Sequence, residues 1–241
     1  MPRKPRFYVP EMPVHIWQRG NNRQEIFFAD SDYNAYLTWM YQGAKRYGCA
    51  IHAYVLMPNH VHCFMTPESI NSVGRMMQFV GRNYVSYINR TYDRSGTLWE
   101  GRYKSSLVNA PQYGLACYRY LETNPIRSNL VATPDAYKWS SYSANAQGKS
   151  RDMLQPLQEY TALGATDDMR QQIYQALLSN PQDKYEMEMI QQCVQSGTPL
   201  GDERYQAELS KKLGFQVGYS KRGRPRKDQA DAFRQSLKSG T

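Results

Sequence analysis

The chain has 241 residues, 41% of them hydrophobic, which is enough for one full domain with a helical extension. No apolar run approaches the roughly eighteen residues of a membrane span, which argues against a membrane protein. The four cysteines lack a CxxC pair, which argues against a cysteine zinc site and favours reduced thiols in a cytoplasmic protein. The basic N-terminus is not followed by an apolar signal segment, in keeping with that location. A net charge of +9 favours a polyanionic partner, because each neutralised phosphate releases counterions.

The first 110 residues predict six elements in a definite order. A strand at residues 15–19 ends in a turn-rich loop, and a helix that Ser31 or Asp32 can cap runs to Gly48. A hairpin of two strands (49–57 and 60–65), a long helix (73–88) and a strand (99–108) follow. The order β-α-β-β-α-β predicts an α+β, ferredoxin-like fold, an antiparallel sheet with helices packed on it. A third helix is expected at about residues 112–124.

Beyond Trp139–Tyr142 the sequence becomes helical and polar. Apolar residues at helical spacing predict three helices, around residues 169–178, 187–194 and 205–213. From Tyr219 onward the chain is polar and basic. We therefore expect a first domain at residues 1–145, a helical extension at 146–215 and a flexible basic tail at 216–241.

The tail carries a run of arginines at Arg222, Arg224 and Arg226 around an Arg-Gly-Arg-Pro core. An extended Arg-Gly-Arg segment is narrow enough to enter an A·T-rich minor groove, so the run resembles an AT-hook. It is equally interpretable as a solvated charge run that contacts phosphates generically. Either interpretation predicts that removing the tail lowers DNA affinity.

Two of the four histidines form the tripeptide His60-Val61-His62 on a predicted strand. Residues two apart on a strand point to the same face, so both imidazoles project together while Val61 faces the apolar layer under the helices. Paired imidazoles make half a site for a divalent metal and leave positions open for another ligand. The alternative is two half-exposed histidines that only form hydrogen bonds. His15 and His52 have no partner at ligand spacing and are interpreted as ordinary strand residues.

Tyr120 and Asn124 are four residues apart, which places them on one face of the third helix. The phenol is an oxygen nucleophile that can form a phosphate ester, and the amide oxygen suits a hard divalent cation. Tyr118 is a competing nucleophile, but it lies off the Asn124 face. Pro125 disfavours helical dihedrals at Asn124, and both tyrosines are alternatively core residues.

Together these motifs resemble one family. Met57–His62 and Tyr120–Arg127 are similar to the REP-associated tyrosine transposases, which belong to the His-hydrophobic-His single-tyrosine transposases (REP, repetitive extragenic palindrome). The loop Arg19–Arg23, the run Leu98–Ser105 and the segment Trp139–Tyr142 are similar to the family in the same order. The resemblance covers about the first 145 residues.

The resemblance implies a ferredoxin-like catalytic domain with the histidines on a central strand. It implies that His60, His62 and Asn124 bind Mg²⁺ or Mn²⁺ and that Tyr120 attacks single-stranded DNA beside an imperfect hairpin. Many relatives in insertion elements have a glutamine where this chain has Asn124. Such an enzyme would work at the nucleoid. We expect DNA contacts from side chains in the shared motifs and the tail, namely Arg19, Asn21, Asn22, Arg23, Arg102, Lys104, Arg127, Arg222, Arg224 and Arg226.

Three other functions fit part of this pattern. A DNA-binding protein of transposase descent would bind hairpins without cleaving them. An RNA-binding module also uses a ferredoxin-like sheet, but Gly101–Lys104 lacks the aromatic alternation of that class. A metal-dependent phosphoesterase with water as nucleophile would need only the histidines. The sequence leaves open whether the protein is a monomer or a homodimer.

Overall fold

The structure, a computed structural model, describes residues 6–218 of the chain. Its centre is one antiparallel sheet in the order β2-β3-β1-β4. The strands are β1 (Val14–Arg19), β2 (Cys49–Met57), β3 (His60–Pro67) and β4 (Lys104–Leu107). β3 lies between β1 and β2 and is antiparallel to both, so β1, helix α1 and β2 form a split βαβ unit. The α+β fold and the element order expected from the sequence are confirmed.

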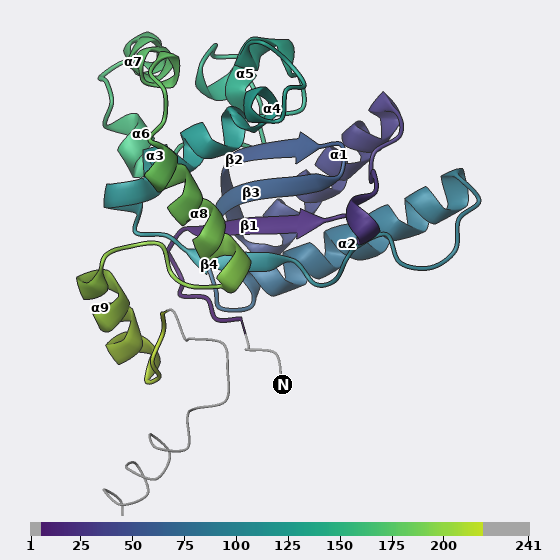
Figure 1. The fold of residues 1–241 in the computed structure, drawn as a ribbon, viewed down its shortest axis with the longest axis horizontal. Coiled ribbons are helices and arrows are strands. Elements are labelled where there is room, and N and C mark those ends of the chain that lie inside the picture. The colour runs from purple at the N-terminus through teal and green to yellow at the C-terminus, as the bar shows by residue number, and fades with distance from the viewer. Residues whose placement is uncertain (1–5, 219–241) are drawn as a thin grey trace, which may run out of the picture.

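Helices cover both faces of this sheet (Figure 1). α1 (Asp30–Tyr47) and α2 (Ser72–Thr91) pack against each other and against β2 on one face. α3 (Ala110–Glu122) and α8 (Lys184–Ser196) lie on the other face, where α8 crosses β1 and β4. Each face has its own apolar cluster, so the sheet is the shared wall of two cores.

The alternation of β3 places its side chains as the sequence predicts. Val61 and Cys63 are buried in the core that α1 and α2 cover. Phe64 belongs to the opposite core, together with residues of α3. His60 and His62 share the parity of Phe64 and therefore face α3 and α8.

Two local predictions were wrong in detail. The N-cap of α1 is Ala29, and Asp32 instead accepts hydrogen bonds from the backbone N–H groups of Phe28 (2.8 Å) and Ala29 (3.0 Å). The strand expected at 99–108 is shorter, because only Lys104–Leu107 joins the ladder. Leu98 and Trp99 are both buried in the α1–α2 core, and consecutive side chains of a regular strand cannot share one face.

The chain after α3 forms mostly short helices. Besides α8, these are α4 (Asn124–Arg127), α5 (Tyr142–Asn145), α6 (Gln158–Thr161), α7 (Asp167–Ser179) and α9 (Glu203–Leu213). A 3₁₀ turn occupies Pro134–Ala136 in this part of the chain, and another lies earlier, at Asn21–Arg23 between β1 and α1. The side chains of Thr166, Asp183 and Asp202 cap α7, α8 and α9 by accepting a backbone N–H. None of the described helices is both long and apolar enough to cross a membrane.

The outer edge of β2 is covered by the segment that follows α4. The N–H of Leu56 donates to the carbonyl of Trp139 (2.9 Å), and the N–H of Ser141 donates to the carbonyl of Tyr54 (3.0 Å). The N–H of Tyr54 in turn donates to Oγ of Ser141 (3.0 Å), and Gln155 adds a backbone bond near the start of β2. Trp139–Tyr142, singled out in the sequence, thus completes the hydrogen bonding of an edge strand.

A buried carboxyl ties α3 to the extension. Glu122 is fully buried at the end of α3 and accepts hydrogen bonds from Ser141, Asn145 (2.8 Å) and Tyr174 (2.8 Å). Burial raises the pKa of Glu122 to about 7, and the three hydrogen bonds only partly oppose this shift. Glu122 therefore anchors the end of α3 to α5 and α7.

This raised pKa makes stability depend on pH. Between the ordinary value of 4.5 and about 7 the folded chain holds a proton that the unfolded chain has lost, so Glu122's contribution is present at low pH and lost as the pH rises. We expect wild type to lose roughly 2 to 3 kcal/mol of unfolding free energy between about pH 5 and pH 8 relative to Glu122→Gln. Urea titrations across this range measure the difference. Glu208→Gln, at an exposed carboxylate of α9, is the control, and an equal pH profile for wild type and Glu122→Gln would contradict the assignment.

Candidate active site

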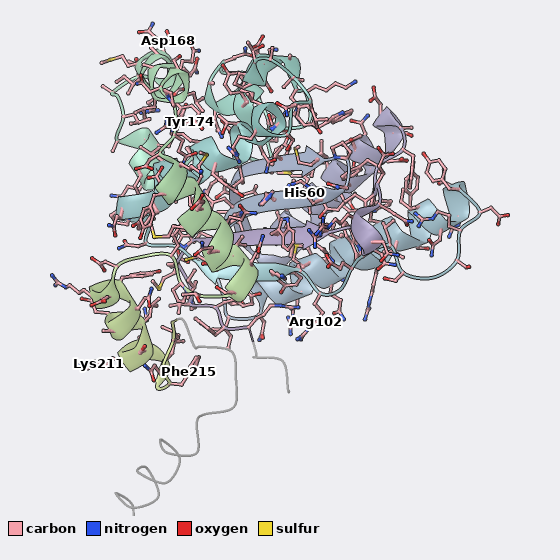
Figure 2. The ribbon with its side chains drawn as sticks, in the orientation of Figure 1. His60, Arg102, Asp168, Tyr174, Lys211 and Phe215 are labelled. Atoms are coloured by element: carbon pink, nitrogen blue, oxygen red, sulfur yellow. The ribbon has the colours of Figure 1, made fainter. Side chains whose placement is uncertain are left out.

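A cleft of about 800 Å³ opens on the face of the sheet that α3 and α8 cover. The ends of β1 and β3 form its floor, and α3, α4 and α8 contribute walls. Figure 2 shows His60 on this part of the sheet. The cleft is lined by Trp17, Arg19, Arg23, Glu25, Met57, Pro58, Asn59, His60, His62, Tyr120, Asn124, Arg127, Ser128, Leu130, Gln191, Val194 and Gln195.

The two histidines of β3 lie side by side in this cleft, with ring centroids 5.2 Å apart. Burial, followed by the charges of Arg19 and Arg127, lowers the pKa of His60 to about 4. Burial, followed by the proximity of His15, His60 and Arg127, holds the pKa of His62 well below its ordinary value. Both imidazoles are therefore neutral at neutral pH, which is the state in which a histidine can bind a metal.

His15 lies on the same face and contacts His62 directly. Its Nε2 is 2.8 Å from Nδ1 of His62, and the two rings meet edge to edge, with centroids 5.0 Å apart and planes inclined by 27°. In the β1–β3 register His62 is opposite Trp17, so His15 is its diagonal neighbour. Burial lowers the pKa of His15 to about 3, so this buried pair is neutral.

Tyr120 and Asn124 both reach the cleft although the helix between them is interrupted. α3 ends at Glu122, and Asn124 opens α4 with Pro125 as its second residue. The ring of Tyr120 lies 5.7 Å from that of His62, edge to face. Asn124 is 7% exposed, and its Oδ1 accepts a hydrogen bond from Oγ of Ser128 (3.2 Å). The two residues expected to share a face therefore do share the cleft with both histidines.

Tyr118 lies elsewhere. Its side chain is fully buried, and its hydroxyl accepts the backbone N–H of Leu157 (3.0 Å). Its ring stacks on Tyr160 in the core beneath the extension. The competing tyrosine is thus a packing residue, away from the histidines.

Arg127 is a cation in direct contact with Tyr120. Its guanidinium lies 4.3 Å from the centre of the Tyr120 ring, and the same group donates to the Tyr120 carbonyl (2.5 Å). Burial raises the pKa of the Tyr120 phenol, and Arg127 opposes that rise. Arg119 instead donates to the Asn180 carbonyl (2.8 Å) and does not line the cleft. Of the two arginines near Tyr120 in the sequence, Arg127 is the one that stabilises its phenolate.

The loop after β1 packs against the turn that precedes His60. The N–H of Gly20 donates to the carbonyl of Asn59 (2.8 Å), and a Cβ at Gly20 would lie 2.2 Å from the carbonyl oxygen of Gln24. Asn59 donates through Nδ2 to the carbonyl of Arg23 (3.2 Å), and its Oδ1 accepts Nδ1–H of His60 (2.7 Å). The Gly20–Arg23 loop therefore supports His60 as well as supplying cations to the cleft.

The expected DNA-binding residues fall into three groups. Arg19, Arg23 and Arg127 line the cleft, and Arg19 also pairs with Glu100. Asn21, Asn22, Arg102 and Lys104 do not line it; Figure 2 shows Arg102 at the edge of the sheet, and Lys104 lies over the ring of Trp17 (5.0 Å). Arg222, Arg224 and Arg226 lie outside the described residues.

Several residues of this site are absent from the sequence-based expectations. They are His15 and Trp17 of β1, and Gln191 and Gln195 of α8. The period-two pattern of β1 already puts His15 and Trp17 on one face, so a correct β1–β3 register would have found them. No local signal identifies the two glutamines, because α8 reaches the cleft only through its packing on β1 and β4.

Comparison with known proteins identifies the class. Residues 8–124 match the family model described as "Transposase IS200 like". The solved structure of a REP-associated tyrosine transposase bound to a REP hairpin is similar in fold, with a TM-score of 0.53 and 15% identity over 65% of this chain and 99% of that one. A structure described as a transposase of Deinococcus radiodurans R1 is 19% identical over 54% of this chain and 99% of that one, with a TM-score of 0.35. A comparison with curated proteins finds no match.

The region that carries β1 to α3, residues 8–124, is similar to the IS200-like transposases. The transposase resemblance expected from the sequence is therefore confirmed by the family match, and the expected fold by the solved structure.

Removing the charge of Arg127 tests its effect on the tyrosine. In Arg127→Gln we expect the pKa of the Tyr120 phenol to rise further, because burial is then unopposed. ¹³C NMR of tyrosines labelled at Cζ, titrated with pH and assigned with Tyr120→Phe, measures this value. Arg119→Gln removes the same charge one residue from Tyr120 in the sequence and should leave the titration unchanged. An unshifted Tyr120 resonance in Arg127→Gln would contradict the electrostatic role.

Proposed function

We propose that this chain is a REP-associated tyrosine transposase that cleaves and rejoins single-stranded DNA beside a hairpin. Tyr120 is the nucleophile, and His60, His62 and Asn124 hold Mg²⁺ or Mn²⁺. The observation that carries the proposal is the meeting of these four side chains in one cleft with Arg19, Arg23 and Arg127. The family match supplies the class, since transposases process DNA.

The donor set fits a divalent cation of this kind. Two neutral imidazoles and an amide oxygen leave coordination positions open for phosphate oxygens and water. Within residues 6–218 no group of three or more histidines, cysteines, aspartates or glutamates is placed to hold a metal, and in this proposal the third protein ligand is of another type. Asn124 has that chemistry, and its carboxamide already lies in the cleft. When bound, the cation would act as a Lewis acid on a non-bridging oxygen of the scissile phosphate.

The side chains then divide the remaining work. Arg19, Arg23 and Arg127 bind the negative phosphates and orient the strand in the cleft. Oη of Tyr120 attacks phosphorus in line, the P–O3′ bond breaks, and the phenol proton is lost as O3′ leaves as a hydroxyl. Arg127 lowers the cost of that proton loss by its position over the phenol ring. The products are a 5′-phosphotyrosine and a free 3′-hydroxyl.

The phosphotyrosine retains the energy of the broken ester. A second 3′-hydroxyl can attack the same phosphorus, displace the Tyr120 phenolate and join two strands without a nucleotide cofactor. One residue thus performs cleavage and strand transfer, because the reverse step has the same geometry as the forward step.

We propose that hairpin DNA is the substrate; the similar solved structure is bound to a REP hairpin. Residues 1–145 would then carry the chemistry, and residues 146–215 would support it. Two contacts favour this division: Glu122 ties α3 to α7 through Tyr174, and α8 contributes Gln191 and Gln195 to the cleft wall. The tail at 216–241 would add DNA affinity.

A nicking assay tests the nucleophile. Labelled single-stranded DNA carrying a genomic palindrome, incubated with Mn²⁺, should give a covalent protein–DNA adduct with wild type. Tyr120→Phe should lower adduct formation by more than about a thousandfold, because loss of a nucleophile removes the covalent route. Tyr118→Phe is the matched control and should retain the adduct, because its hydroxyl only accepts a backbone N–H in the core.

The other outcomes discriminate among functions. Hairpin binding without an adduct would favour a non-cleaving DNA-binding protein. Cleavage that persists in Tyr120→Phe without an adduct would favour water as nucleophile, and an adduct that persists there would move the nucleophile to another tyrosine.

Metal removal tests the second half of the site. With EDTA we expect cleavage to stop while hairpin binding, followed by fluorescence anisotropy, persists, because the arginines contact phosphates without the cation. Added Mn²⁺ should restore cleavage in wild type and not in a His60→Ala, His62→Ala double variant. Cleavage that is unaffected by EDTA would contradict a metal-dependent mechanism.

A further inference from the structure

The contact between His15 and His62 has a consequence for which ring nitrogen of His62 is free. The Nε2–Nδ1 distance of 2.8 Å requires one shared proton, and both rings are nine-tenths or more buried. A neutral imidazole has one N–H and one lone pair, so the contact has two possible arrangements. They differ in what His62 presents to the cleft.

If His15 donates from Nε2, His62 accepts at Nδ1 and its own proton sits on Nε2. That nitrogen could then not bind a metal without first losing its proton. If His62 donates from Nδ1, His15 accepts at Nε2, and Nε2 of His62 carries a free lone pair. The second arrangement alone leaves His62 ready as a ligand.

The neighbouring histidine has the same arrangement. Nδ1 of His60 lies 2.7 Å from Oδ1 of Asn59, and an amide oxygen can only accept, so the proton is on Nδ1 of His60. Nε2 of His60 therefore carries the lone pair. Asn59 and His15 occupy equivalent places, each against Nδ1 of one histidine of the pair.

We propose that His15 is a positioning residue of the metal site: it accepts the Nδ1–H of His62 and thereby holds His62 as the tautomer whose Nε2 binds the divalent cation. This inference rests on the proposed function, because it takes His60 and His62 as ligands. A partner that fixes the tautomer and orientation of a ligating histidine contributes strongly to metal affinity. The same hydrogen bond also keeps the His62 ring from turning, because it lies close to the planes of both rings.

The test is the affinity of the full-length chain for Mn²⁺ without DNA, measured from the electron paramagnetic resonance signal of free Mn²⁺. His15→Phe keeps an aromatic ring against His62 and removes the acceptor. His15→Gln restores an acceptor close to the place of Nε2. We expect His15→Phe to weaken Mn²⁺ binding by about 10- to 100-fold and His15→Gln to recover most of the loss.

A second readout reports the tautomer directly. In long-range ¹H–¹⁵N spectra of the metal-free wild type, His62 should show a protonated Nδ1 and an unprotonated Nε2. His15→Phe should lose this pattern and His15→Gln should keep it. Thermal unfolding of the two variants controls for stability, since a merely structural role would change the melting temperature without separating their Mn²⁺ affinities.

The outcomes distinguish the role of His15 from the proposal that His60 and His62 bind the metal. Unchanged Mn²⁺ affinity in His15→Phe, or a wild-type His62 protonated on Nε2, would overturn the role of His15 while the ligand assignment stands. If the His60→Ala, His62→Ala double variant binds Mn²⁺ as wild type does, the ligand assignment fails, and the role of His15 fails with it.

Discussion

The antiparallel pairing of β1 with β3 is the constraint on which the candidate site depends. It sets His62 opposite Trp17 and diagonal to His15, and it brings Arg19 opposite His60. A slip of one residue would turn the histidines toward the apolar core that α1 and α2 cover. That core resists such a slip, because Val61, Cys63 and Ile16 fill it from the other face of the same strands. The packing of one face therefore fixes the chemistry of the other.

Whether a feature of the fold or the site could be predicted depends on how far apart in the sequence the interacting residues lie. Hydrophobic periodicity is local, so the shared face of His60 and His62 could be derived from the sequence alone, as could the order of helices and strands along the chain. The proximity of Tyr120 to the histidines could not, because it depends on how α3 packs on the sheet; only the family resemblance supplied it. His15 was missed for the same reason, since its partner is 47 residues away along the chain.

Asn124 lies in the cleft as expected, although the continuous helix on which that expectation depended does not form. Its expected place beside Tyr120 assumed a continuous helix, yet the helix breaks between Glu122 and Asn124. The short helix α4 restarts at once, and Arg127 bridges the break by donating to Thr123 (2.5 Å) and to the carbonyl of Tyr120. The break thus shifts the backbone without moving the amide out of the cleft.

The covering of β2 bears on how two copies of the chain could associate. The open edge of a sheet is a template on which a second molecule can add a strand, and β2 is the longest strand at an edge of this one. Here the backbone groups of Tyr54 and Leu56 are already occupied by residues 139–141 of the same chain. Before β2 could form a continuous sheet across two molecules, residues 139–141 would have to dissociate from it. Strand addition that leaves the fold intact would therefore have to use another edge of the sheet.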